Sequence, residues 1–319
     1  MNRVKNYLSL VTFSHTIFAM PFALIGFFLA ITRFGYIHFN QSNYEWYVFT
    51  GTQKLEIVSN PFVHYPKTSQ EIIIRFFLII LCMIFARSAA MAFNRWLDAK
   101  YDAMNPRTAV REIPAGIIKP NNALAFTIAN CILFITATFF INTLCFYLSP
   151  VALFVILFYS YTKRFTALCH LVLGVGLSLA PIGAYIAVTG QFNVLPILFS
   201  FTVLFWVSGF DIIYALQDEE FDKKNQLHSI PSAVGKVKAL RISELLHLLS
   251  ATCVIGAGIY GHFSWFYWIG VAFYISLLIY QHLLVKPNEL IKVNRAFFTT
   301  NGIASVVFAL FVLLDLFIH

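Results

Sequence analysis

Carboxylates are the side chains of this sequence whose spacing most clearly suggests chemistry, because five of its six aspartates fall in two short motifs. The first motif, NRWLDAKYD, places Asn94, Asp98 and Asp102 at intervals of four residues. A helix would carry these three side chains on one face. The motif follows a long apolar run, so the sequence predicts a polar stripe at the end of an apolar helix.

The second motif, DIIYALQDEEFD, repeats this arrangement. Asp211, Asp218 and Asp222 are separated by seven and four residues and again share one helical face. A solvated helix end would explain one such aspartate. Five of six aspartates in two matched clusters favour a common ligand instead.

A cation is the ligand that these positions favour. A carboxylate at membrane depth costs about 2.5–3.5 kcal/mol, and the negative end of the helix dipole adds about 0.3–1 kcal/mol. Oxygen ligands without histidine or cysteine suit Mg²⁺. Mg²⁺ usually combines one or two carboxylates with water and substrate phosphates. The two motifs therefore predict a site that binds a diphosphate through Mg²⁺.

Basic side chains that could complete such a site lie between the two motifs. Arg107 and Arg111 stand in NPRTAVREIPAG, and Lys163 and Arg164 stand in YSYTKRF. Arg87 differs because it lies within an apolar run, where a charge normally has a partner. The first aspartate of the second motif and a bound phosphate are the candidate partners of Arg87.

The elements that hold these side chains must be membrane helices. The chain has 319 residues, of which 59% are hydrophobic and 11% are charged, whereas soluble proteins carry about 25% charged residues. Its mean hydropathy of +0.76 and its long apolar runs indicate a polytopic helical protein in the lipid bilayer. A transmembrane β-barrel would show shorter, alternating segments. We therefore predict one all-α domain over residues 1–319.

The apolar runs predict about nine transmembrane helices in one bundle. They cover residues 7–32, 71–97, 122–141, 144–161, 167–188, 194–217, 239–260, 264–285 and 296–318. The first run is longer than the apolar core of a signal peptide, which has about 7–15 residues. That length favours a retained first span.

The lysines and arginines are distributed unevenly between the two ends of these spans. Of the 22, seventeen lie at one end, four lie at the other, and Arg87 lies within a span. This asymmetry predicts a cytoplasmic N-terminus, cytoplasmic loops at 98–121 and 218–238, and an outer segment at 34–70 in a cell (inner) membrane. The net charge of +8 thus reports topology and does not suggest a nucleic-acid partner.

Three further features leave alternatives open. The five cysteines lie in or beside apolar runs without CxxC spacing, which favours small packed residues over a disulfide or zinc site. His15 could contact a substrate, although a lone histidine on a helix is more often packed. The outer segment 34–70 is interpreted as a solvated connector, with a binding element as the alternative.

Three stretches of the sequence resemble one known family. NRWLDAKYDAMNPRTAVREIPAG resembles the first signature of the UbiA-type membrane prenyltransferases, and DIIYALQDEEFDKKNQLHSIPSAVG resembles their second. YSYTKRF is similar to their intervening YxxxK element, with Tyr159 and Lys163. The resemblance covers essentially the whole chain and implies the UbiA-like bundle of nine helices.

The resemblance implies Mg²⁺-dependent transfer of a polyprenyl group from its diphosphate onto an aromatic acid. It assigns metal and diphosphate binding to Asn94, Asp98, Asp102, Asp218 and Asp222. It assigns phosphate binding to Arg107, Arg111 and Lys163, and it places Tyr214 and Asp211 along the site. The abundant aromatic side chains could shield the allylic cation and stabilise it by about 0.5–2 kcal/mol per cation–π contact.

The aromatic acceptor stays open between 4-hydroxybenzoate and a dihydroxynaphthoate, for ubiquinone or menaquinone biosynthesis. HTIFAMPFALIG and RSAAMAFNR resemble proteins often labelled 4-hydroxybenzoate polyprenyltransferases. Within that group they look closer to the branch inferred to prenylate a dihydroxynaphthoate in the futalosine route to menaquinone. Arg95 follows Asn94 where many 4-hydroxybenzoate enzymes have aspartate, which weakens that assignment. Gln226 replaces an expected glycine, which could alter a turn.

Two other classes of function fit the sequence less well. An ion- or proton-coupled transporter should carry ionisable residues near mid-membrane in several helices, often within an inverted repeat. Here the aspartates collect at one end of the spans. A structural membrane subunit would leave both aspartate clusters unexplained.

Overall fold

The computed structural model describes residues 3–11, 18–32, 49–50, 53–54, 66, 68–287 and 289–318. The membrane-length helices are α3 (Ser69–Leu97), α5 (Pro120–Ile141), α6 (Thr143–Thr162), α7 (Cys169–Thr189), α8 (Val194–Ala215), α11 (Lys236–Tyr260), α12 (Trp265–Leu284) and α13 (Asn301–Ile318). The shorter helices are α1 (Arg3–Val11), α2 (Met20–Thr32), α4 (Ala99–Met104), η2 (Leu216–Asp218), α9 (Glu219–Lys224), α10 (Ile230–Val234) and the π-helical turn η3 (Arg295–Thr300). Two short strands, β1 (Phe49–Thr50) and β2 (Gln53–Lys54), form an antiparallel pair.

The predicted all-α membrane bundle is confirmed. Within the described residues, eight helical segments are long and apolar enough to cross a membrane, and α2 is a shorter apolar helix. Seven of the eight helices begin and end within about three residues of the predicted spans, and α13 begins five residues after the predicted start at 296 because the π-helical turn η3 precedes it. Long uninterrupted apolar runs explain the agreement, because in lipid the helix satisfies every backbone hydrogen bond internally.

The predicted first span, 7–32, is not one helix. The structure has α1 and α2 in its place, and residues 12–17 between them lie outside the described part of the chain. Pro21 is the second residue of α2. Proline suits the first turn of a helix because it lacks the N–H that a helix interior needs. A helix start is therefore the favoured position for Pro21.

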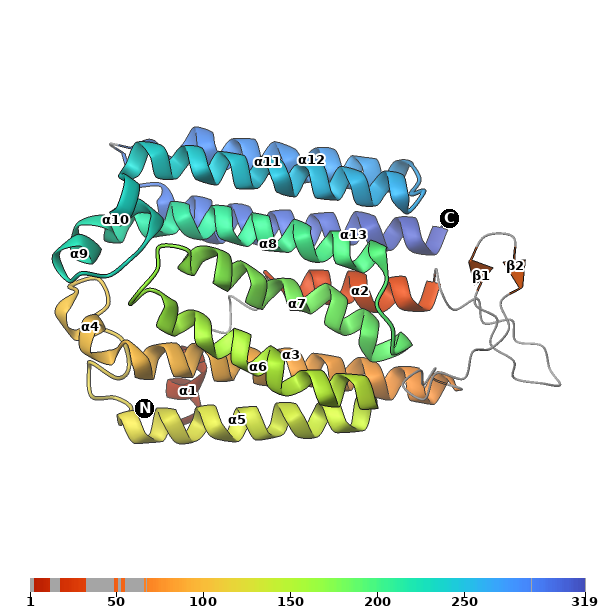
Figure 1. The fold of residues 1–319 in the computed structure, drawn as a ribbon, viewed down its shortest axis with the longest axis horizontal. Helices are drawn as coiled ribbons and strands as arrows, with labels where there is room; N and C mark the ends of the chain where they lie inside the picture. Colours follow the sequence, from red (N-terminus) through yellow and green to blue (C-terminus); the bar gives the residue numbers. More distant parts are fainter. Residues whose placement is uncertain are drawn as a thin grey trace.

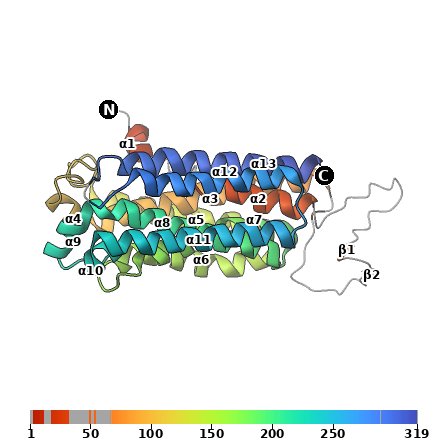
Figure 2. The same ribbon diagram turned by 90° about the horizontal axis from the view of Figure 1, so that it is seen from above.

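The long helices lie side by side, and the short helices α4, α9 and α10 gather at one end of the bundle (Figure 1). We call this end the acidic end, because both aspartate motifs terminate there. The view from above shows the same grouping, with β1 and β2 beyond the other end (Figure 2). The predicted cytoplasmic loops 98–121 and 218–238 thus contain short helices.

Helix α8 is the central element of the bundle, because it packs extensively against both α7 and α11. Its side chains Phe199, Val203 and Trp206 are fully buried. Trp206 donates a hydrogen bond from Nε1 to Asn301 Oδ1 at 3.0 Å, which ties α8 to α13. The second aspartate motif therefore extends from the most firmly packed helix of the structure.

The far end of the bundle is fastened by polar side chains that cap helix termini. Arg75 donates to the carbonyl of Val188 at 2.8 Å, near the end of α7. Asp315, the sixth aspartate, accepts hydrogen bonds from the backbone N–H groups of Ser264 (3.1 Å) and Tyr267 (3.2 Å) at the start of α12. Asp315 satisfies N–H groups that a helix terminus leaves without partners, and its role is structural.

Candidate active site

The first aspartate motif carries two carboxylates that each contact a basic side chain. Asp98 ends α3, where it accepts a hydrogen bond from Asn94 Nδ2 at 3.0 Å and pairs with Arg164 at 3.1 Å. Asp102, in α4, pairs with Arg111 at 2.7 Å. The spacing of four residues keeps these groups on one side of the helix end, as predicted.

The carboxylates of the second motif also contact basic side chains. Arg107 donates from Nε to Asp218 Oδ1 at 3.1 Å, and its Nη2 contacts the other oxygen of the same carboxylate. Asp222 is fully buried in α9 and pairs with Lys163 at 2.7 Å. Ser229 donates to the second oxygen of Asp222 at 2.8 Å. A bidentate arginine–carboxylate pair is stronger than a single hydrogen bond between neutral groups.

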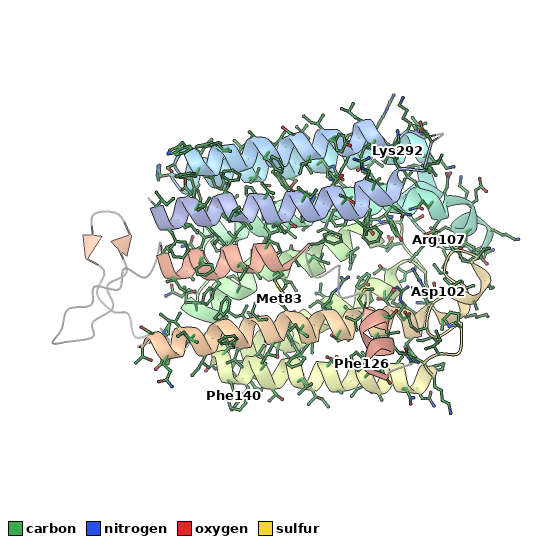
Figure 3. The ribbon with its side chains drawn as sticks, turned by 180° about the vertical axis from the view of Figure 1, so that it is seen from behind. Met83, Asp102, Arg107, Phe126, Phe140 and Lys292 are labelled. Atoms are coloured by element: carbon green, nitrogen blue, oxygen red, sulfur yellow. The ribbon has the colours of Figure 1, made fainter. Side chains whose placement is uncertain are left out.

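The loop after α4 brings the two motifs together. Asn105 precedes Pro106, and its side-chain oxygen accepts the backbone N–H of Arg107 at 3.0 Å in an Asx turn. The turn directs Arg107 toward Asp218, and Asn105 Nδ2 also donates to Asp218 at 3.3 Å. The loop that follows the first motif therefore contacts the second motif directly. In Figure 3, the labelled Asp102 and Arg107 lie at the same end of the bundle.

The site balances negative charge against positive charge in partly buried surroundings. Burial raises the pKa of Asp98 to about 6, although the charge of Arg164 acts in the opposite direction. Burial favours the neutral amine of Lys163, but the ion pair with Asp222 outweighs it and raises the pKa of Lys163. The carboxylates thus depend on neighbouring cations to remain charged.

Two other predicted residues, Tyr214 and Asp211, lie on the same face of α8. Arg107 donates to the hydroxyl of Tyr214 at 2.8 Å, and its guanidinium lies 5.2 Å from the centre of the Tyr214 ring. Asp211 lies 2.7 Å from His170 Nδ1. Sequence reasoning gave no role to Asn105 or His170, because neither belongs to a spaced cluster of like residues.

Arg87 does not bind Asp211, one of its two predicted partners. Asp211 is paired with His170 instead, and Arg87 Nε is buried without a hydrogen-bond partner among the described residues. Arg87 and Tyr159 both line a cavity that begins near the acidic end. Contact between Arg87 and a bound phosphate stays a prediction.

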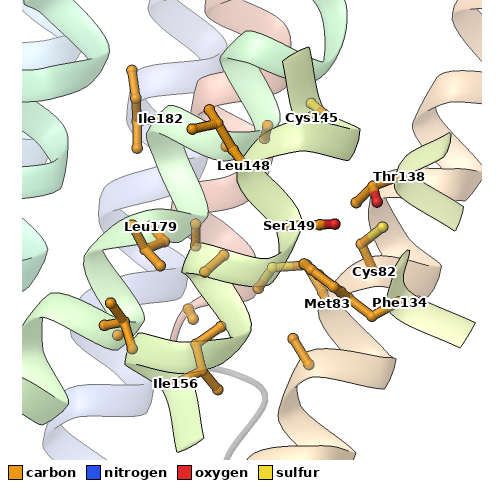
Figure 4. Close-up of a pocket in the computed structure, with 18 of the residues that line it drawn as sticks. Cys82, Met83, Phe134, Thr138, Cys145, Leu148, Ser149, Ile156, Leu179 and Ile182 are labelled. Atoms are coloured by element: carbon orange, nitrogen blue, oxygen red, sulfur yellow. The ribbon is translucent and has the colours of Figure 1, made fainter. Parts of the chain in front are cut away.

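The cavity runs along the bundle between α3, α5, α6 and α7 and has a volume of about 340 Å³. Its lining is largely apolar, with side chains such as Met83, Phe134 and Leu179 (Figure 4). It extends from Arg87 and Tyr159 toward the far end of the bundle. An apolar chain fits such a lining, and a charged headgroup does not.

The oxygen ligands at the acidic end suit Mg²⁺ by type. Asp102 Oδ2 is buried and accepts no hydrogen bond from any described residue. Across the described part of the chain, no three acidic, histidine or cysteine side chains converge as a metal site would require. The ion pairs explain this, because each carboxylate of the motifs already contacts a basic group or histidine. The predicted ligand set stays a prediction: Asn94, Asp98, Asp102, Asp218 and Asp222.

Comparisons with known sequences point to one family. The model of the UbiA prenyltransferase family matches residues 64–303. A protein named 4-hydroxybenzoate octaprenyltransferase from Tolumonas auensis is 32% identical over 230 residues, covering 70% of this chain and 78% of that protein. A protein of the same name from Francisella tularensis subsp. novicida is 28% identical over 231 residues, covering 72% and 81%.

Solved structures show the same fold. A UbiA homolog from Aeropyrum pernix K1 superposes with a TM-score of 0.71 at 24% identity, covering 95% of this chain and 97% of that chain. A UbiA homolog from Archaeoglobus fulgidus bound to DMAPP and Mg²⁺ has a TM-score of 0.67 at 18% identity, with 98% and 100% coverage. At these identities, the likeness concerns the arrangement of helices.

The Lys163–Asp222 pair predicts a large loss of stability when only one partner is removed. Lys163→Met should lower the free energy of unfolding by about 3–5 kcal/mol, because Asp222 would remain buried without a cation. Thermal unfolding in detergent measures the change. The double variant Lys163→Met, Asp222→Asn should recover most of it.

Lys292→Met provides the matched control at the same end of the bundle. Lys292 and Glu289 pair at 3.9 Å with about half of each side chain exposed, so this variant should change stability by less than about 1 kcal/mol. Equal unfolding temperatures for Lys163→Met and Lys292→Met would contradict the account of the buried pair.

Proposed function

The chain belongs to the UbiA prenyltransferase family, and we propose that it transfers a polyprenyl group from its diphosphate onto an aromatic acid. One observation carries the proposal beyond family membership. The contacts of Asn105 and Arg107 with Asp218 join the two aspartate motifs at the head of an apolar cavity. A polar headgroup site therefore adjoins a site for an apolar chain, as a lipid diphosphate requires.

The ion pairs prepare the acidic end for a diphosphate. In the proposed complex, Mg²⁺ would be held by Asn94, Asp98, Asp102, Asp218 and Asp222. Arg107, Arg111 and Lys163, which pair with Asp218, Asp102 and Asp222, would then bind phosphate oxygens. Arginine suits this exchange because its planar fork binds carboxylate and phosphate alike. Bound Mg²⁺ would neutralise the negative charge of the leaving diphosphate.

The cavity is the proposed site of the prenyl chain. C–O cleavage leaves an allylic cation near the mouth of the cavity, where Tyr159 and Arg87 lie. The largely apolar walls exclude water from this cation. Arg87, whose Nε has no partner among the described residues, is placed to contact a phosphate oxygen and would keep its charge away from the chain.

The acceptor and the orientation belong to the same proposal. Relatives that are 28–32% identical are named 4-hydroxybenzoate octaprenyltransferase, which supports 4-hydroxybenzoate. HTIFAMPFALIG and RSAAMAFNR, which resemble the futalosine branch more closely, support a dihydroxynaphthoate. Both acceptors remain candidates. The basic residues around the acidic end favour a cytoplasmic active site in the inner membrane. Membership of the UbiA prenyltransferase family favours an enzyme over the ion- or proton-coupled transporter.

Membranes that contain the protein should form the prenylated product only when Mg²⁺ and an aromatic acid are both present. A radiolabelled donor, offered with 4-hydroxybenzoate or with dihydroxynaphthoates, measures the transfer, and product masses identify the acceptor. Asp98→Asn and Asp218→Asn should each lower transfer about 100-fold or more, because they remove charge that holds the metal and diphosphate.

Glu289→Gln is the control for these variants, since Glu289 is an exposed acidic residue whose nearest basic contact is the weak pair with Lys292. It should transfer at the wild-type rate. Full activity of both aspartate variants would refute the metal site, and inactivity of the wild type with every aromatic acid would refute the proposed reaction.

If the prenyl chain occupies the cavity, a larger side chain there should limit the protein to donors with a shorter prenyl chain. Gly183 lines the cavity, and a Cβ added there would meet no other atom within 4 Å. Gly183→Leu should therefore fold normally and lower transfer from an octaprenyl donor about tenfold. Transfer from a geranyl donor should change little.

Gly256→Leu is the matched control, because its Cβ also meets no atom within 4 Å and Gly256 does not line the cavity. The measurement is the ratio of rates with the two donors. A ratio unchanged by Gly183→Leu would place the prenyl chain elsewhere.

A further inference from the structure

His170 lies outside both aspartate motifs, yet it contacts one aspartate of the site. It is the second residue of α7, and only 3% of it is exposed. Its Nδ1 lies 2.7 Å from Asp211 Oδ2, and the backbone N–H of Ile230 donates to its Nε2 at 3.4 Å. Because Nε2 accepts, the proton of a neutral ring must be on Nδ1, where it is donated to Asp211.

Asp211 differs from the other four aspartates of the two motifs. Each of those four contacts a guanidinium or an ammonium group, in the pairs Asp98–Arg164, Asp102–Arg111, Asp218–Arg107 and Asp222–Lys163. Among the described residues, Asp211 pairs only with the imidazole of His170. Its charge is therefore oriented by a hydrogen bond and is not neutralised by a permanent cation.

Asp211 also lies deeper in the bundle than the aspartates that would bind diphosphate. Seven residues separate it from Asp218, which corresponds to about 10 Å along a helix. Its partner His170 lies three residues before Leu173 on α7, and Leu173 lines the cavity. Asp211 thus lies between the layer of ion pairs and the cavity, at the level where the prenyl carbon would react.

We infer that Asp211 accepts the proton lost by the aromatic acceptor and that His170 is the positioning residue that orients it. The inference rests on the proposed function. In the reaction, the C–O bond of the donor breaks with its electron pair on the diphosphate, and a π pair of the ring forms the new C–C bond. The ring C–H bond then breaks, its electrons restore aromaticity, and the proton passes to Asp211.

The contacts of His170 explain why the base would be held so firmly. Ile230 follows Ser229, whose hydroxyl binds Asp222, and the N–H of His228 donates to the Lys163 carbonyl at 2.7 Å. The imidazole therefore ties Asp211 to the same loop that binds Asp222. A base held in one orientation is effective, because small misplacements of a catalytic group cost up to about 100-fold in rate.

The test separates loss of the proton from cleavage of the diphosphate. Purified protein is given prenyl diphosphate with the aromatic acid that the wild type accepts, carrying either hydrogen or deuterium at the position of attack. Transfer is measured with both, and diphosphate release is measured without the aromatic acid. The variants are Asp211→Asn, His170→Leu and His170→Asn, the last of which keeps an N–H donor near Nδ1.

The wild type should show no primary isotope effect, because proton loss is fast. Asp211→Asn should lower transfer about 100-fold, keep most diphosphate release and show an isotope effect above one. His170→Leu should lower transfer by a smaller factor and also raise the isotope effect. His170→Asn should transfer at close to the wild-type rate. His247→Asn is the control, since His247 is a buried histidine of α11 that contacts His282, and it should leave the isotope effect unchanged.

Three results would overturn the inference. Transfer by Asp211→Asn without an isotope effect would show that another group takes the proton. Equal loss of transfer and diphosphate release would assign the pair to donor binding or folding. Equal losses in His170→Leu and His170→Asn would remove the orienting role of His170. Absence of transfer by the wild type would refute the proposed function itself, and the inference with it.

Discussion

The structure depends on one constraint: carboxylates at the end of an apolar bundle must each have a partner that stabilises their charge. The Arg107–Asp218 contact is the most consequential solution, because it joins the loop after α4 to η2, which follows α8. Without it, the two motifs would be separate acidic helix ends. With it, they form one site whose basic groups can exchange carboxylate for phosphate.

The remaining architecture serves this site. Helix α8 is anchored by fully buried aromatic side chains and by the Trp206–Asn301 hydrogen bond. It therefore presents Asp211 and Tyr214 from a rigid base, and Asp218 from the turn η2 that follows it. Capping by Arg75 and Asp315 fastens the far end, where no chemistry is proposed. Between the two ends, the apolar cavity offers a water-poor path for a lipid chain.

Much of the fold could be predicted from the sequence because apolar runs and helical spacing act locally. The spans from α3 onward and the convergence of the two motifs follow from such patterns, whereas phosphate binding by Arg107, Arg111 and Lys163 stays a prediction. Which basic residue pairs with which aspartate depends on tertiary packing, as does the contact of His170 with Asp211. The division of 7–32 into α1 and α2 was missed because hydropathy does not register the start of a helix at Pro21. His15 lies outside the described residues.

A structure determined with Mg²⁺ and a non-hydrolysable prenyl diphosphate analogue tests the central claim most directly. The account predicts metal ions between the Asp98–Asp102 and Asp218–Asp222 pairs, with Arg107 released from Asp218 and bound to a phosphate oxygen. The prenyl chain should occupy the cavity lined by Met83 and Leu179. An intact Arg107–Asp218 contact, with the diphosphate bound away from both motifs, would contradict it.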